Sequence, residues 1–518
     1  MRRRSGRLIM YGVMLGVALG SMCAVVGCSS GDGGDDLIAA TPVGLENQSF
    51  AFTNGRAFAA ALANVAVTLT FGNFTNDGDA NPNTGLFTLT TAAGTARGTV
   101  TIASCNLAVE ASTLASDTFP ELQPGQTVPL NPCLINPDNG SLRVQNVTTG
   151  AVSTSDEPNP LPTTDVAFVI TTDASSGGDT GSYSVIDLLS RNTFNDIVPG
   201  GIHSDALARA FNGLIYVVNR LGVDSIQVID PQQEFTTPLN GEVSVNTGGA
   251  TGLNPQDIAF VSATKAYVSR LKSTRLLVIN PTTLTITGEI DLVAQVPTLV
   301  KPGDLDGVPE LSRMLVHNGL LYIVLQHLDF TTGFSPAKVA PGEVVVLDPA
   351  TDTVVTVIGL NGTNPFSALQ FNAALNRILV SSIGDFGVND GGIEAIDPTT
   401  NTTDAAFVID EASIGGDITH FQIVSATKGF AVVTDATFQN ALVSFNPTTG
   451  QKLTTLLEPA SPFLPYFAIN SLGELYLAQS GATTPTQGVR IFNTATDAEI
   501  TTTALNVGLP PSFVLFLE

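Results

Sequence analysis

The 518-residue chain carries 46 acidic and 21 basic side chains, which gives it a formal net charge of −25. An acid excess of this size opposes a phosphate backbone, so the composition argues against nucleic acid as a partner. With 43% hydrophobic residues the chain can bury a large core, which excludes a wholly disordered protein. Its length exceeds that of one ordinary domain unless a repeat spreads the core out.

Residues 1–27 are typical of an export signal, with four arginines ahead of an apolar segment. The segment ends in Val25-Val26-Gly27-Cys28, which resembles a bacterial lipobox, where the chain is cleaved before the Cys and its sulfur is lipidated. One alternative is a transmembrane helix, which the interrupting glycines and the polar residues that follow disfavour. The other is cleavage before Cys23, which the bulky residue ahead of it disfavours.

Lipidation of Cys28 predicts a protein anchored to a membrane, since two or more acyl chains hold a protein stably. Residues 28–40 form a flexible acidic tether that would lift the folded part off the surface. Ser29 after the Cys resembles lipoproteins sent on to the outer membrane. We therefore expect a location in the bacterial cell envelope, at the outer membrane, on its periplasmic or its surface side.

Residues 41–153 contain short alternating runs separated by Asn, Gly and Pro clusters, a pattern that predicts a small β-sandwich-like domain. Cys105 and Cys133 both fall in this region. In an oxidising compartment they are expected to form one disulfide, and the alternative is a pair of free buried thiols. Residues 154–164 are rich in Pro and acidic residues, as in a linker between domains.

From residue 165 to 518 a strand ending in Asp or Asn, mostly followed by Pro, recurs seven times. These residues are Asp187, Asp230, Asn280, Asp348, Asp397, Asn446 and Asn493, at intervals of 43 to 68 residues. A second strand precedes each copy, and further strands complete units of about four strands. This period and strand number predict a seven-bladed β-propeller. The Asx residues would bond their own backbone in the turn after the strand, which makes them structural.

The repeat resembles a known family at Tyr216-Val217-Val218-Asn219, which is followed by Ile226-Gln227-Val228-Ile229-Asp230-Pro231. These residues are similar to the YVTN-type β-propeller repeat, which shares its fold with lactonase-like proteins. The resemblance covers about two thirds of the chain. It implies an all-β propeller and says almost nothing of function.

The C-terminal end of the chain is predicted to close the propeller. The first blade lacks an innermost strand, because a Pro-rich linker precedes it, and Ser512 to Leu517 form an apolar strand left over after the seventh blade. Pairing of this strand with the first blade would cover strand edges that are otherwise exposed.

Long, acidic loops are expected on one face of the propeller, where binding usually resides on such a scaffold. Beside these loops, histidines at strand ends make a three-histidine site conceivable. The candidate residues of this face are His203, Asp304, Asp306, Glu310, His327, Asp385, Asp390, Asp417 and His420.

No cofactor is fixed by the sequence, and Ca²⁺ is the candidate that such oxygens would take. A weak second cation motif lies at Asp77, Asp79 and Asn81, with Pro82 where a calcium loop needs Gly.

Two functional hypotheses follow. The first is a non-enzymatic, monomeric binding scaffold that takes an envelope protein or a polysaccharide on its long-loop face. The alternative is a metal-assisted lactonase-like hydrolase, which needs His203, His420, Asp304 and Asp417 to converge on one cation.

Overall fold

The computed structural model describes residues 38–39, 48–52, 56–62, 66–75, 84–101, 106–135, 142–149, 151–154, 162–173, 180–198, 200–233, 235–238, 240–332, 336–460, 463–481 and 487–518. The predicted signal peptide, Cys28, the acidic run after it and Cys105 lie outside these residues, as do Asp77, Asp79 and Asn81. The side chain of Cys133 also lies outside them. Among the helices of the described part, none is long and apolar enough to cross a membrane.

The chain divides into two compact units. Among the described residues, one unit holds residues 38–162 with Ser190–Thr193, and the other holds Thr163–Leu189 and Phe194–Glu518. The division near residue 162 falls within the predicted linker.

The N-terminal unit contains two antiparallel sheets. One sheet runs in the order β2 (Ser49–Phe52), β3 (Val67–Thr75), β4 (Thr84–Thr91), β5 (Gly94–Thr101), β6 (Asn106–Ser112) and β7 (Thr127–Val128). The other runs in the order β1 (Ile38–Ala39), β8 (Leu130–Ile135), β9 (Leu142–Asn146) and β10 (Val152–Thr154). Buried side chains from both sheets, such as Phe71 and Val144, form one apolar cluster, as expected where two sheets pack face to face.

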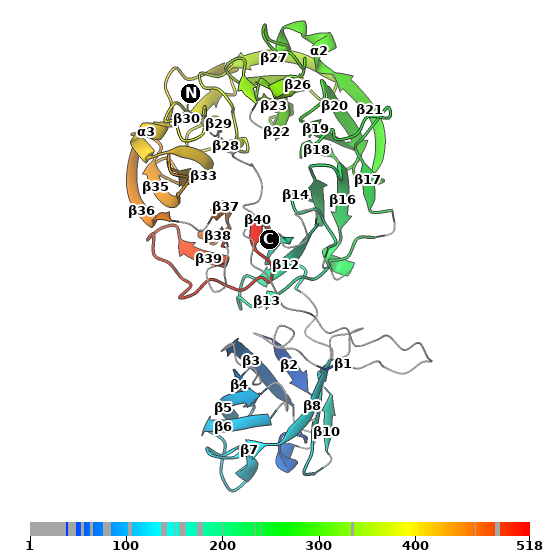
Figure 1. Ribbon diagram of the computed structural model, residues 1–518, viewed down its shortest axis with the longest axis vertical. Helices are drawn as coiled ribbons and strands as arrows, with labels where there is room; N and C mark the ends of the chain where they lie inside the picture. Colours follow the sequence, from blue (N-terminus) through cyan, green and yellow to red (C-terminus); the bar gives the residue numbers. More distant parts are fainter. Residues whose placement is uncertain are drawn as a thin grey trace, which may run out of the picture. The chain divides into compact units, whose positions relative to one another are not determined.

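The C-terminal unit is an all-β, propeller-like ring, and Figure 1 shows its sheets following one another around a centre. In strand order, the first sheet consists of β13 (Thr193–Phe194), β12 (Thr180–Asp187), β11 (Val166–Asp173) and β40 (Pro511–Leu517). The second consists of β14 (Ala206–Phe211), β15 (Leu214–Asn219), β16 (Ser225–Ile229) and β17 (Glu242–Ser244). The third consists of β18 (Pro255–Ser262), β19 (Lys265–Arg270), β20 (Arg275–Asn280) and β21 (Thr285–Asp291).

The fourth sheet consists of β22 (Leu311–His317), β23 (Leu320–Leu325), β26 (Glu343–Asp348) and β27 (Thr353–Gly359). The fifth consists of β28 (Gln370–Asn372), β29 (Arg377–Ser382), β30 (Gly392–Asp397) and β31 (Thr402–Thr403). A further strand, β32 (Ile409–Asp410), also pairs with β30. The sixth and seventh are β33 (Asp417–Ser425), β34 (Lys428–Thr434), β35 (Asn440–Asn446) and β36 (Gln451–Ala460), and β37 (Phe463–Ile469), β38 (Glu474–Ser480) and β39 (Gly488–Asn493).

The core of the ring lies between neighbouring sheets. Apolar clusters join the third sheet to the fourth, the fourth to the fifth, the fifth to the sixth, the sixth to the seventh, and the seventh to the first. Inner strands such as β16 are therefore buried along their whole length, whereas the outer strand β21 is exposed over most of its length. This contrast explains why the second and third strands are rich in Val, Ile and Leu and the outer strands in Thr.

The predicted turn chemistry is confirmed. In six copies the Asx Oδ1 accepts a hydrogen bond from the backbone N–H two residues later, at 2.8 to 3.0 Å. These acceptors are Asp230, Asn280, Asp348, Asp397, Asn446 and Asn493. The pattern places second strands at Leu214–Asn219, Lys265–Arg270 and Arg377–Ser382, and β15, β19 and β29 have these bounds.

Two elements differ from expectation. The first strand of the fifth sheet, expected from Phe366 to Phe371, is reduced to β28, and ahead of β28 the backbone N–H of Ser381 donates to Ser367 Oγ. In the seventh sheet three strands are present, and the segment after β39 meets it only at isolated bridges, Val489 with Leu505 and Phe492 with Glu499.

The last strand of the chain, β40, pairs antiparallel with β11 over Val166 to Thr171. It adds Val514 to the apolar cluster between the first and seventh sheets, and Phe513 stacks on Tyr466 of β37 at 4.2 Å. Residues more than 300 positions apart therefore share one sheet.

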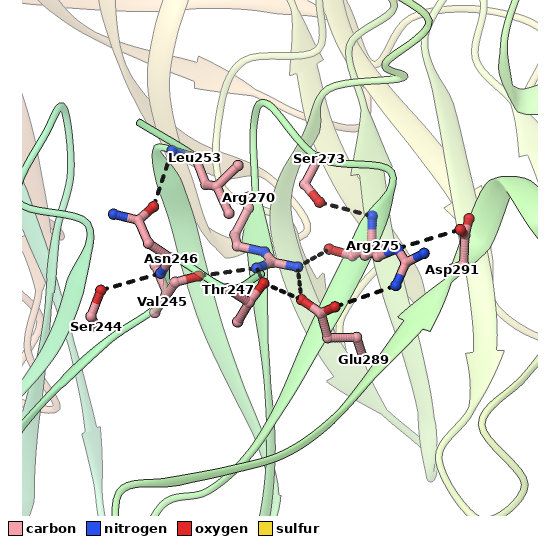
Figure 2. Close-up of polar contacts among 10 residues, drawn as sticks. All are labelled: Ser244, Val245, Asn246, Thr247, Leu253, Arg270, Ser273, Arg275, Glu289 and Asp291. Carbon is pink, nitrogen blue, oxygen red and sulfur yellow. Dashed lines mark hydrogen bonds and ion pairs between the residues drawn. The ribbon is translucent and has the colours of Figure 1, made fainter. Parts of the chain in front are cut away.

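A polar network joins the second sheet to the third (Figure 2). Arg270, at the end of β19 and 1% exposed, donates to the carbonyl of Val245 at 3.0 Å and to Thr247 Oγ1 at 2.9 Å. Its other terminal nitrogen binds Glu289 of β21 at 2.6 Å. The more exposed Arg275 lies 3.5 Å from the second oxygen of Glu289. Arg270 thus satisfies groups from both sheets at once.

Tyrosine hydroxyls form further ties between neighbouring sheets. Tyr216 of the second sheet donates to the carbonyl of Pro281, and Tyr322 of the fourth donates to Asn401 Oδ1. Tyr267 of the third sheet likewise donates to Asp352. In each case the hydroxyl reaches the turn that follows the third strand of the next sheet, so the Asx turns also serve as docking points.

Candidate functional site

The candidate residues of the long-loop face lie at one side of the ring. The register pairs Ala206, which begins a first strand, with Asn219, which ends a second strand, and Asp417 is paired with Thr434 in the same way. Loops before first strands and after second strands therefore open on the same side, which we call the long-loop side. His203, Asp304, Asp306, Glu310, His327, Asp385, Asp390 and Asp417 all belong to such loops or strand ends.

Asp304, Asp306 and Glu310 meet at the entrance to β22. Glu310 is 1% exposed, and its Oε2 accepts the backbone N–H of Leu328 at 2.6 Å. Burial raises the pKa of Glu310 to about 9, and the charges of Asp306 and Asp304 add to the rise. This carboxyl therefore keeps its proton at neutral pH and ties two loops together, rather than presenting a charge to a ligand.

His327 follows β23 and is fully buried. Its Nε2 lies 3.0 Å from Glu343 Oε2 on β26, and Lys301 Nζ lies 2.6 Å from the other oxygen of that carboxylate. Burial acts to raise the pKa of Glu343, but His327 and Lys301 hold it below its usual value. His327 is thus part of an internal ion-pair group.

A second acidic group lies between the fifth and sixth sheets. Asp417 is fully buried, and its Oδ2 accepts the backbone N–H of Gly387 at 2.8 Å. Glu411, in the short helix α3 (Glu411–Ile414), is also fully buried and accepts the N–H of Gly391 at 2.8 Å. Asp385 and Asp390 lie nearer solvent, where Lys338 binds Asp385 at 2.8 Å.

His203 and His420 do not meet these groups. His203 Nδ1 accepts the backbone N–H of Asp205 at 3.1 Å within a local turn. Over the described part of the chain, no three His, Cys, Asp or Glu side chains are grouped so as to hold a metal ion. The convergence of His203, His420, Asp304 and Asp417 that the hydrolase hypothesis needs is therefore not seen among the described residues, and neither is the conceivable site of three histidines.

A different polar group lies on the innermost strands of the ring. It consists of Arg209 on β14, Asp257 on β18, Arg313 on β22, His420 on β33 and Tyr466 on β37, and we call it the axial cluster. Arg209 and Asp257 form a two-pronged ion pair, Nε to Oδ1 at 2.9 Å and Nη2 to Oδ2 at 3.0 Å. Tyr466 belongs to a sheet that does not neighbour that of Arg209, yet it lies close enough to raise the pKa of Arg209. Contacts between such distant sheets require that these side chains meet around the axis.

The electrostatics of the axial cluster are unusual for so acidic a chain. Burial acts to lower the pKa of Arg209, but Asp257 raises it above its usual value. Burial, together with the charges of Arg220 and Arg209, lowers the pKa of Arg313 to about 10. Both guanidinium groups stay protonated at neutral pH.

His420 is the neutral member of the cluster. It is 5% exposed, and its Nε2 lies 2.8 Å from the carbonyl oxygen of Phe467. A carbonyl can only accept, so Nε2 carries the proton and Nδ1 keeps its lone pair. Burial lowers the pKa of His420 to about 3, and repulsion from Arg313 and Arg209 contributes. The ring also packs against Tyr466, with centroids 4.0 Å apart.

Sequence reasoning named His420 but missed Arg209, Asp257, Arg313 and Tyr466. The available signal was a single charged residue inside an otherwise apolar first strand, as in Ala-Leu-Ala-Arg-Ala-Phe at 206–211. A buried charge in such a strand needs a partner from another sheet.

Comparison with known proteins gives fold-level similarity alone. No family model matches the sequence, and no curated protein is recognisably similar. Among solved structures, the chain resembles apo AztD from Citrobacter koseri (11% identity, TM-score 0.42, 67% of this chain and 97% of that one) and dihydro-heme d1 dehydrogenase NirN in complex with DHE (13%, 0.40, 70% and 76%). Kuenenia stuttgartiensis hydrazine synthase is similar over 51% of this chain and 71% of that one (13%, 0.35). Identities and scores this low carry no argument about ligand or activity.

Proposed function

We propose that this chain is a cell-envelope lipoprotein, anchored through Cys28 at the outer membrane, whose C-terminal unit is a seven-bladed β-propeller that binds a ligand. In this proposal β40 completes the first blade and closes the ring. The support for the propeller is the order of seven sheets around one ring and the pairing of β40 with β11. The support for the anchor is the sequence before residue 29.

The observation that carries the binding function is the axial cluster. Its polar side chains come from five sheets and are held in place by an ion pair and by hydrogen bonds, so their donors are oriented before any ligand arrives. The Arg209 side chain keeps 26% of its exposure, and Arg313 and Tyr466 are half-buried, so solvent reaches the group. An oriented and reachable polar group on a rigid ring suits recognition of a ligand.

The test compares the wild-type chain with Cys28→Ala. The substitution is expected to move the protein from the membrane fraction to the soluble fraction. Hydrogen–deuterium exchange on the released protein, mixed with fractionated envelope polysaccharide and protein, is then expected to show protection on the long-loop side or in the innermost strands. Membrane retention of Cys28→Ala would contradict the anchor. Metal-dependent turnover of a lactone panel, abolished by a chelator, would favour the lactonase-like alternative.

A further inference from the structure

Arg313 is a guanidinium at the centre of the ring that forms no ion pair with a carboxylate of the described residues. Its Nη1 donates to the backbone carbonyl of Gln256 at 2.8 Å, and it forms no ion pair with any residue of the described chain. Its Nε and Nη2 therefore keep donors that no described group uses. Arginine at such a site is suited to holding a planar anionic group with two parallel hydrogen bonds.

The nearby carboxylate cannot take this role. Asp257 Oδ1 accepts Arg209 Nε and the backbone N–H of Ile258, both at 2.9 Å. Its Oδ2 accepts Arg209 Nη2 and the backbone N–H of Met314, both at 3.0 Å. Each oxygen thus already has two donors. Arg209 and two backbone N–H groups therefore occupy Asp257, and Arg313 forms no hydrogen bond with it.

The remaining charges near Arg313 do not neutralise it. Arg220 lies on the long-loop side of the cluster and pairs with Asp205, and its Nη1 donates to Gln256 Oε1 at 3.3 Å. The three arginines therefore face two carboxylates, so one positive charge is uncompensated in a chain whose net charge is −25. The neutral His420 adds no charge. An unpaired charge in a crowded site is costly, and a bound anion would remove that cost.

We propose that the axial cluster binds a small anion through a carboxylate or phosphate group, with Arg313 as the main donor and Arg209 and Tyr466 beside it. This inference rests on the proposed binding function and narrows its ligand to molecules that carry such a group. The axial cluster is positive, whereas the whole chain is negative. An anion is therefore attracted only once it is close to the cluster, and this makes the site selective.

The test uses the full chain in its soluble Cys28→Ala form, which serves as the wild-type background, with inorganic phosphate and acetate as the two probes. Wild type, Arg313→Gln, Arg313→Lys and Lys452→Gln are compared by calorimetric titration and by thermal unfolding. Lys452→Gln removes one positive charge from an exposed position on β36 and is the matched control. A probe that binds the wild type is expected to bind saturably and less tightly at higher ionic strength. Which probe binds separates a phosphate ligand from a carboxylate ligand.

Arg313→Gln is expected to weaken binding by about tenfold or more, since it removes charge-assisted hydrogen bonds. The affinity of Arg313→Lys should lie between those of wild type and Arg313→Gln, because Lys keeps the charge and loses the planar arrangement of donors. Without anion, Arg313→Gln should melt no lower than wild type, which shows that it folds. The inference is overturned if neither probe binds saturably, or if Arg313→Gln binds as wild type does. If neither probe binds while envelope material still protects the long-loop side, the inference fails and the proposed binding function stands.

Discussion

Glu411 and Asp417 are buried carboxyls that hold a loop in place. They accept the backbone N–H groups of Gly391 and Gly387, which belong to the loop after β29. Burial, together with the charge of a neighbouring carboxylate, raises the pKa of Glu411 to about 8 and that of Asp417 to about 6. Asp417, which the sequence placed on a solvent-facing binding surface, is thus a buried group that holds a loop inside the fold.

These two groups predict how stability depends on pH. Both folded pKa values lie above the usual values of 4.5 and 3.8, so folding disfavours ionisation. Below about pH 4 both groups are protonated in the folded and in the unfolded state, so their burial does not lower the free energy of unfolding. As pH rises towards 8 the unfolded chain loses these protons first, so stability falls and then levels off. Glu411→Gln is expected to remove a decline on the order of 3 kcal/mol between pH 5 and 8.

Urea unfolding at several pH values measures this, with tyrosine fluorescence as the signal. The chain has no Trp, and its tyrosines after the signal peptide all lie in the ring, at 183, 216, 267, 322, 466 and 476. The fluorescence therefore reports on the ring alone. Glu458→Gln, at an exposed position on β36, is the control. An equal pH slope in Glu411→Gln and wild type would contradict the assignment.

The end of β19, where Arg270 lies, holds the second and third sheets together. Arg270→Gln would leave the carbonyl of Val245 and the carboxylate of Glu289 without their main donor. Because Arg270 is 1% exposed but Glu289 is partly solvated, we expect a loss of about 2–3 kcal/mol in the unfolding free energy of the ring.

Arg275→Gln is the matched control from the same network (Figure 2). Arg275 is 54% exposed and lies 3.5 Å from Glu289, so its loss should cost below about 1 kcal/mol. Urea unfolding by tyrosine fluorescence compares the two variants. Equal effects would show that the buried guanidinium has no special part in joining the sheets.

The elements that sequence predicts well are those set by neighbours in the chain. The β15 and β19 strands are predicted by a run of apolar residues. The Asx turn at Asp230 is predicted because its side chain accepts the backbone N–H two residues later. The axial cluster could not be predicted in this way. Arg209 meets Tyr466 only because the ring closes, and no local pattern reveals which strands face one another across it.

The whole ring is expected to depend on its last strand. Deleting residues 510–518 exposes the edge of β11 and removes Val514 from the cluster between the first and seventh sheets. We expect the truncated chain to be insoluble or to lose cooperative unfolding, as measured by tyrosine fluorescence during a urea titration. Val514→Asp, which keeps the chain length and buries a charge there, should act in the same direction. A soluble truncation with a sharp transition would rule out closure by β40.

Pairing of β11 with β40 also has a consequence in time. The strand β40 is synthesised more than 300 residues after β11, so β11 has one open edge while the rest of the ring is being made. An open edge invites pairing with the wrong strand, whether from the same chain or from another. The first sheet therefore stays incomplete until β40 has left the ribosome, and a chaperone that shields β11 until then would raise the yield of correctly folded protein.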